Sequence, residues 1–208
     1  MAQQLDRLKE TASQTAGPYV HIGLTPNFCG IGGVYPADLG TTMRNEETRG
    51  QRITVTGRVI DGGNKPLTDC VVEIWQADST GLYPSPGEWR GDADPNFSGW
   101  GRCPADSETG EYRFETIKPG RVPAKDGRLQ APHISFWIVA RGINVGLHTR
   151  LYFDDEAEAN AADFVLSRIS DPQRRKTLIA EKSKADGKAI YRLDIRLQGD
   201  DETVFFDL

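Results

Sequence analysis

Residues 52–60 read RITVTGRVI, and this stretch decides the fold class. Ile53, Val55 and Val59 lie on one face of the stretch, while the arginines and threonines between them lie on the other. Alternation with a period of two is typical of a β-strand that buries one face. The turn-forming run DGGN at 61–64 follows at once. We therefore start from a β-strand that ends in a tight turn.

Further segments with strand character occupy the middle and the end of the chain. Residues 133–141 (HISFWIVAR) are apolar on both faces, which predicts a central strand. A short terminal strand is expected at 203–206. The remaining predicted strands are residues 70–76, 111–117, 148–153 and 190–197.

Helices are expected to be few and short. Residues 155–162 are acidic and alanine-rich, and residues 171–182 begin with Asp171 as an N-cap and Pro172 at the first helical position. Residues 5–11 predict one further turn. Glycine (22) and proline (12) are frequent, so many turns are required, and residues 81–103 are expected to form a long ordered loop. The sequence predicts a mainly β protein: a β-sandwich core with long ordered loops and a few short peripheral helices.

Composition limits the classes of function. The 208 residues suit one domain at 51–208 preceded by an arm at 1–50. A net charge of −5 argues against nucleic-acid binding, and no apolar run is long enough to predict a membrane span. The polar N-terminus shows no secretory signal. Three cysteines, Cys29, Cys70 and Cys103, favour a reduced cytoplasmic chain without disulfides and have no role that we can assign.

Histidines and tyrosines near strand ends are the best chemical candidates. His133 and His148 each open a predicted strand, and Tyr83 and Tyr112 flank the long loop. A histidine at a strand end is most often a structural hydrogen-bonding group. The chain has only three histidines, and none stands at a metal-ligand spacing, so spacing alone gives weak support for a metal site.

Several longer motifs, in order along the chain, indicate a family. From about residue 8 to its end the chain resembles the intradiol ring-cleaving dioxygenases, and specifically the alpha chain of members built from two kinds of chain. The motifs are TAGPYVH (15–21), EIWQAD (73–78), DPNF (94–97), TIKPG (116–120), APHI (131–134), ARGIN (140–144), LHTRLYFDD (147–155) and ETVFFD (202–207).

The resemblance implies a β-sandwich, a ferric iron cofactor, and ring opening of 3,4-dihydroxybenzoate by O2 to 3-carboxy-cis,cis-muconate. It also implies that iron is held by two tyrosines and two histidines. Tyr83 and His133 match two of these positions, but Val122 and Ser135 stand at the others. Neither can replace an anionic or imidazole donor for a hard cation. We expect this chain to hold no iron, and Tyr83 and His133 to be buried remnants that hydrogen-bond to each other or to nearby chain.

By the same resemblance, an alpha chain such as this one completes the substrate pocket at its interface with an iron-bearing beta chain. The arm at 1–50 contributes to that interface, and Thr15, Gly17, Pro18 and Tyr19 approach the partner's iron site. Arg141 meets the substrate carboxylate, because a guanidinium can bind a carboxylate through two hydrogen bonds. Taken without the resemblance, Arg141 is interpreted as a structural ion-pair residue. The alpha–beta pairs form larger assemblies.

Two other functions stay open. The chain could be an independent enzyme with a different metal site, or a non-enzymatic β-sandwich that acts as a scaffold or binding module. Trp89, Phe97 and Trp100 lie in the predicted loops, where aromatic side chains suit either a protein interface or ordinary packing.

Overall fold

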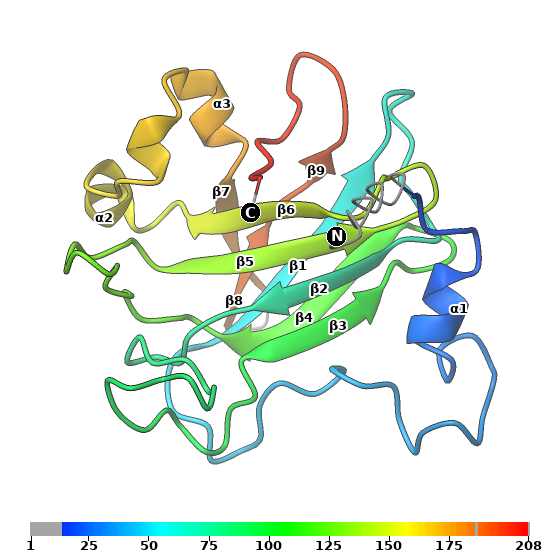
Figure 1. Cartoon of the computed structure of the whole chain (residues 1–208), viewed down its shortest axis with the longest axis horizontal. Helices are drawn as coiled ribbons and strands as arrows, with labels where there is room; N and C mark the ends of the chain where they lie inside the picture. The colour runs from blue at the N-terminus through cyan, green and yellow to red at the C-terminus, as the bar shows by residue number, and fades with distance from the viewer. Residues whose placement is uncertain (1–13, 186, 208) are drawn as a thin grey trace, which may run out of the picture.

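The computed structural model describes residues 14–185 and 187–207 and contains mainly strands (Figure 1). The strands are β1 (Arg52–Ile60), β2 (Val71–Trp75), β3 (Trp100–Pro104), β4 (Glu111–Ile117), β5 (His133–Val139), β6 (Leu147–Phe153), β7 (Ile179–Ala185), β8 (Lys188–Arg192) and β9 (Ile195–Arg196). The helical elements are α1 (Val20–Leu24), α2 (Ala157–Ala161), a 3₁₀ turn at Leu166–Arg168, and α3 (Pro172–Lys176).

The strands form a sheet in the order β3-β2-β5-β6-β7-β8-β1-β4, with β9 also paired to β1. The sheet folds over itself into two layers, and Figure 1 shows β3, β2, β5 and β6 in front of β1, β4 and β8. Ile53 and Val55 from the rear layer meet Ile134 and Phe136 from the front layer in one apolar core. The predicted β-sandwich class with short peripheral helices is confirmed. The expected division at residue 50 stays a prediction.

Strand β1 spans the predicted residues 52–60 and is more deeply buried than its alternation indicates. Thr54 and Thr56, on its polar face, are also buried. Thr56 satisfies its hydroxyl by donating to the Tyr112 carbonyl (2.8 Å). At Gly57 a Cβ atom would lie 1.9 Å from the Leu193 carbonyl oxygen, so only glycine fits there. The phenol of Tyr112 donates to the same carbonyl (2.5 Å), which makes Tyr112 a structural residue.

Strand β5 lies between β2 and β6, which confirms its predicted central place in the front layer. The prediction of one strand over 190–197 is wrong, because the chain breaks at residues 193–194 between β8 and β9. Leu193 there donates its N–H to the Thr56 carbonyl (2.9 Å). Asp194 accepts a hydrogen bond from the Arg58 N–H (3.1 Å). Strand β8 therefore pairs with the first half of β1 and β9 with its end, and the Leu193 backbone between them packs against Gly57, where no side chain is in the way.

Three other predictions need correction. The helix predicted over 171–182 is shorter. Asp171 caps α3 by accepting from the Gln173 N–H (2.8 Å), but the helix ends at Lys176. Residues 179–185 form β7 instead, because β6 and β8 offer this segment backbone partners on both sides. Residues 203–206 form a single bridge, between Phe206 and His148, rather than a strand. The long loop ends at Trp100, where β3 begins. The predicted turn at 5–11 lies outside the described residues.

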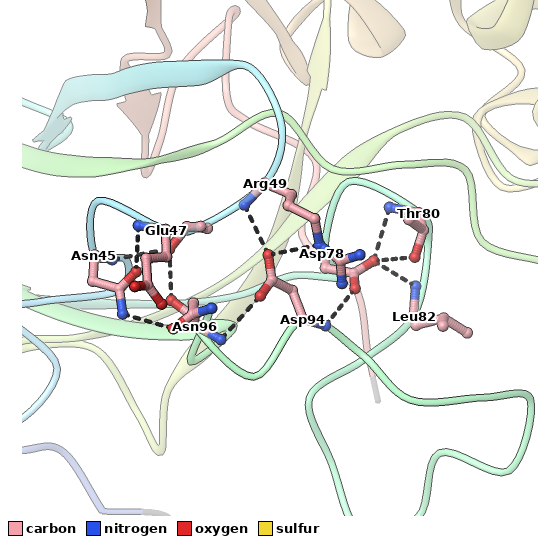
Figure 2. A network of polar contacts seen from close by, with 9 residues as sticks. Asn45, Glu47, Arg49, Asp78, Thr80, Leu82, Asp94 and Asn96 are labelled. Carbon is pink, nitrogen blue, oxygen red and sulfur yellow. Dashed lines mark hydrogen bonds and ion pairs between the residues drawn. The ribbon is translucent and has the colours of Figure 1, made fainter.

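Two buried aspartates hold the long loop, and both belong to motifs that carried the family resemblance (Figure 2). Asp78 accepts from the Thr80 N–H (2.8 Å) and hydroxyl (2.7 Å) and from the Asp94 N–H (2.9 Å). Asp94 in turn accepts from the Arg49 N–H (2.8 Å), and this bond ties the loop to the N-terminal segment. Hydrogen bonds from the N–H groups of Arg49 and Asn96 hold the pKa of Asp94 below its ordinary value. The aspartates of the motifs EIWQAD and DPNF are therefore structural here.

The described cysteines Cys29, Cys70 and Cys103 are all free thiols, and Cys70 is buried. Within residues 14–185 and 187–207, no helix has the length and apolar character needed to cross a membrane.

Candidate functional site

The four positions expected for iron donors gather at the start of β5. His133 is 4% exposed, and its Nδ1 lies 2.8 Å from the Ala131 carbonyl. Burial, with a smaller contribution from the nearby Arg150 guanidinium, lowers the pKa of His133 to about 4. The ring is therefore neutral at pH 7. Of the two predicted partners for His133, Tyr83 or nearby chain, the structure shows nearby chain.

The prediction that Tyr83 is a buried remnant of an iron ligand is wrong in its burial. Its side chain is half-buried and stacks on Trp75, with 5.7 Å between ring centroids and 7° between planes. Among the described residues, no hydrogen bond joins Tyr83 to His133. Burial raises the pKa of Tyr83 above its ordinary value, so its phenol stays protonated. The stacking holds Tyr83 against the sheet.

A cation already lies at this end of β5. Arg150 on β6 is paired in register with Ser135, and its Nη1 donates to Gln130 Oε1 (2.9 Å) and the Tyr152 hydroxyl (3.4 Å). Its charge acts on both His133 and Tyr83. Val122 is buried and offers no donor atom. Two missing donors and a fixed guanidinium do not fit a ferric ion, and the described residues contain no cluster of three or more His, Cys, Asp or Glu side chains suited to a metal.

Of the other predicted residues, Thr15 lies beside the turn that carries Arg141, at the opposite end of β5. Thr15 bridges to Asn144, and its hydroxyl accepts from the Gly142 N–H (2.7 Å). Val145 donates its N–H to the Gln14 carbonyl (2.7 Å). The TAGPY segment and the ARGIN turn are 125 residues apart in sequence, and the structure places them side by side. The Thr15 hydroxyl is used within the chain, so Thr15 fixes the turn that carries Arg141.

Arg141 is 67% exposed, and its Nε lies 2.8 Å from Oδ2 of Asp69, whose side chain is only 16% exposed. Among the described residues, Asp69 is the only polar partner of this guanidinium. It stands at the edge of an open hollow of about 390 Å³ that Gly62, Ile143 and Gln198 also line. The half-buried carboxylate of Asp69 thus holds the Arg141 guanidinium, which still faces solvent.

Both segments that meet here expose residues to solvent. After Thr15, Gly17 and Pro18 are exposed, and Tyr19 is 74% exposed. Val145 is 73% exposed and has a φ of 65°, a left-handed conformation that is costly for a β-branched residue. A strained, exposed apolar residue in the turn after Arg141 is a feature that keeping the fold alone does not require.

Sequence reasoning did not identify Asp69 or Arg150. Asp69 lies in a turn-rich segment with no motif, and its pairing with Arg141 is long-range. Arg150 belongs to the quoted motif LHTRLYFDD, and the register of β6 against β5 pairs it with Ser135. Among the other candidates, Phe97 is buried in the core, Trp100 lies in β3, and Trp89 is 88% exposed.

Comparison with known proteins assigns the family. The family model described as Dioxygenase matches residues 25–199. The chain belongs to this family, the intradiol dioxygenases. These enzymes depend on ferric iron, and the assignment confirms the resemblance found in the sequence motifs.

Individual intradiol dioxygenases match over most of the chain. The protocatechuate 3,4-dioxygenase alpha chain of Pseudomonas putida is 45% identical over 203 residues, which cover 98% of each chain. The protocatechuate 3,4-dioxygenase beta chain of Burkholderia cepacia is 37% identical over 168 residues, covering 77% of this chain and 70% of the beta chain. The solved dioxygenase domain of a carbohydrate-binding fusion protein from Streptomyces sp. SirexAA-E matches with a TM-score of 0.58 and 27% identity, covering 79% of this chain and 88% of that domain.

Proposed function

We propose that this chain is the alpha subunit of a protocatechuate 3,4-dioxygenase and completes the substrate pocket of an iron-bearing beta chain. The observation that carries the proposal is the contrast at β5. One end lacks two of the four expected iron donors and holds Arg150, while the other presents an exposed Arg141 beside the TAGPY segment. Similarity to alpha chains along almost the full length supports the same assignment.

Arg141 has the chemistry needed to orient 3,4-dihydroxybenzoate, which is also called protocatechuate. This substrate carries a carboxylate on the side of the ring opposite its two hydroxyls. A guanidinium that faces solvent and rests on Asp69 can bind that carboxylate through two hydrogen bonds. Remote binding of this kind positions the ring without touching the reacting carbons. Gly17, Pro18 and Tyr19 would form an adjoining wall of the pocket.

An exposed apolar segment supports pairing with another chain. Between residues 19 and 39 several large side chains face solvent, although monomeric proteins rarely leave a contiguous apolar patch uncovered. The segment has a defined shape, because Asp38 accepts from the N–H groups of Asn27 (2.8 Å) and Phe28 (2.7 Å). A prearranged apolar surface lowers the entropic cost of association. The exposed side chains are Tyr19, Phe28, Ile31, Val34, Tyr35 and Leu39.

In the proposed complex, ferric iron on the beta chain supplies the activation of the catechol for reaction with O2. This chain contributes carboxylate binding through Arg141, a fixed turn through Thr15, and part of the pocket wall. The product would be 3-carboxy-cis,cis-muconate. We also propose a cytoplasmic location, which suits three free thiols, and a larger assembly of alpha–beta pairs.

Expression of the chain alone and with a beta-type partner tests the proposal. We expect no iron and no ring cleavage from the chain alone, and a co-purifying, coloured and active complex from the pair. Iron at about one atom per chain in the isolated protein would instead support an independent enzyme. A partner whose activity does not change when this chain is omitted would support a non-enzymatic scaffold.

A further inference from the structure

The loop at residues 81–90 places its charged side chains inside and its tryptophan outside. Trp89 is 88% exposed, whereas the side chains of its neighbours Glu88 and Arg90 are only 6% and 19% exposed. Folded chains usually show the reverse, because charged side chains are rarely buried and a large aromatic ring gains free energy by leaving water. The fold alone therefore does not require a tryptophan at this position.

The ion pair between Glu88 and Arg90 fixes the shape of this loop. Glu88 accepts from the Tyr83 N–H (3.0 Å), from the Arg90 N–H (3.0 Å) and from Arg90 Nε (2.8 Å). Arg90 Nη2 also donates to the Gly81 carbonyl (2.9 Å). The hydrogen bonds from Arg90 lower the pKa of Glu88 to about 2, so the pair stays charged at pH 7. A loop that is shaped in advance presents Trp89 to a partner at a low entropic cost.

A second exposed loop, residues 121–129, packs beside the first. At Gly81 a Cβ atom would lie 2.1 Å from the Arg121 carbonyl oxygen, so the two loops are in close contact there. Arg121 Nη2 donates to the Leu129 carbonyl (3.1 Å), which links the two ends of the second loop. Leu129 is 46% exposed, and Arg121 and Lys125 are exposed as well. The two loops thus present apolar side chains together with cations.

The charge of these two loops is opposite to that of the whole chain. Arg128 pairs with Asp126, as Arg90 does with Glu88. Within the described part of the chain, Arg121 and Lys125 are left as the cations of the two loops without a carboxylate partner. The whole chain carries a net charge of −5. A cationic surface on an acidic protein is complementary to the remaining surface of an identical chain.

We infer that Trp89 is the centre of a contact between two copies of this chain, with Arg121 and Lys125 at the rim facing carboxylates of the other copy. Tryptophan is among the side chains that contribute most to binding when a rim of other contacts excludes water around it. The contact joins two unlike surfaces, and such contacts can link more than two copies. The inference rests on this chain alone and does not depend on the proposed pairing with a beta chain.

Sedimentation velocity of the full chain over a range of concentrations tests the contact. We expect reversible self-association that weakens as added salt screens the rim charges. Trp89→Ser should lower the association constant at least about 30-fold, the loss expected for a side chain at the centre of an interface. Val34→Ser removes another exposed apolar side chain, far along the sequence, and is the matched control that should leave the association constant unchanged.

A second variant tests the rim separately from the tryptophan. Lys125→Glu keeps Trp89 and should also weaken self-association, with a difference from the unmodified chain that shrinks in high salt. Both positions are exposed, so urea denaturation should show unchanged folding. Three results would overturn the inference: no self-association of the chain, an equal association constant in Trp89→Ser, or failure of Trp89→Ser to pair with a beta-type partner, which would make that partner the occupant.

Discussion

The two ends of β5 carry an arginine each, and the arginines stand in opposite environments. Arg150, beside the start of the strand, is half-buried among neutral partners where a metal would have to bind. Arg141, just past its end, is 67% exposed and paired with Asp69. The first environment is closed and stabilised by buried polar groups, whereas the second is open and strained. The closed end holds the fold through buried hydrogen bonds, and the open end is the one at which we propose contact with the substrate.

The largest expected effect is at the closed end, at Asp163. This buried carboxylate accepts from the N–H groups of Ala131 (2.8 Å), Val165 (2.8 Å) and Leu166 (2.9 Å). Asp163→Ala would leave these buried donors unpaired, at a cost of about 3 kcal/mol or more in the free energy of unfolding. Urea denaturation measures the change, with Asp200→Ala, at an exposed position, as control. Equal losses in the two variants would contradict a closed, fold-maintaining end.

The next effect is a pH dependence that originates at His133. Its pKa is about 4 in the folded chain against an ordinary value of 6.5, so the unfolded chain binds more protons between these values. The stabilisation is complete above about pH 6.5 and declines as the pH falls, by up to about 3 kcal/mol in total. Urea denaturation between pH 7.5 and pH 5 should show this slope, and it should flatten in His133→Gln. Asp155, with a pKa of about 2, titrates below this window. The same slope in His133→Gln would assign it to another group.

At the open end the main effect is kinetic. In the complex, Arg141→Ala should lower kcat/KM for 3,4-dihydroxybenzoate about 10- to 150-fold, the value of a hydrogen bond to a charged group (about 1.5–3 kcal/mol). Catechol, which has no carboxylate, should be affected little, and Arg141→Lys should recover part of the loss. The free energy of unfolding should change by less than about 0.5 kcal/mol, as for other surface positions. An equal loss with both substrates would mean that Arg141 does not bind the carboxylate.

The smallest effect is expected at Asp69. Asp69→Asn removes the charge that holds Arg141, and exposed ion pairs contribute less than about 1 kcal/mol. We expect KM for 3,4-dihydroxybenzoate to rise about two- to fivefold with kcat nearly unchanged. Steady-state kinetics on the complex with both substrates measures the change. A fall in kcat with catechol as well would show a general structural disturbance instead.

The sequence predicted those elements in which a local pattern agrees with the final environment. Alternation located β1, and the apolar run located β5, because both strands bury residues at the predicted positions. The helix prediction was wrong over residues 179–182, which begin strand β7. Backbone pairing with β6 and β8 and burial of Ala180 in the core favour the strand there. Helix propensity was outweighed there by tertiary context.

At the candidate site, the sequence motifs identified Arg141 and Thr15 but not the residues that Arg141 and Ser135 contact in the folded chain. The ARGIN and TAGPY motifs pointed to Arg141 and Thr15, and the structure brings them together. The ion pair with Asp69 depends on how the loops fold, so no local pattern could reveal it. The place of Arg150 beside Ser135 depends on the register of β6 against β5, which a single sequence does not specify.

The location of iron in crystals of the reconstituted complex tests the central claim most directly. Anomalous scattering at the iron absorption edge gives that position independently of activity. We expect one iron peak per pair, held by the partner chain on the side where this chain presents Arg141 and Thr15, with no peak beside His133. A peak beside His133 and Ser135 would show instead that this chain holds the iron.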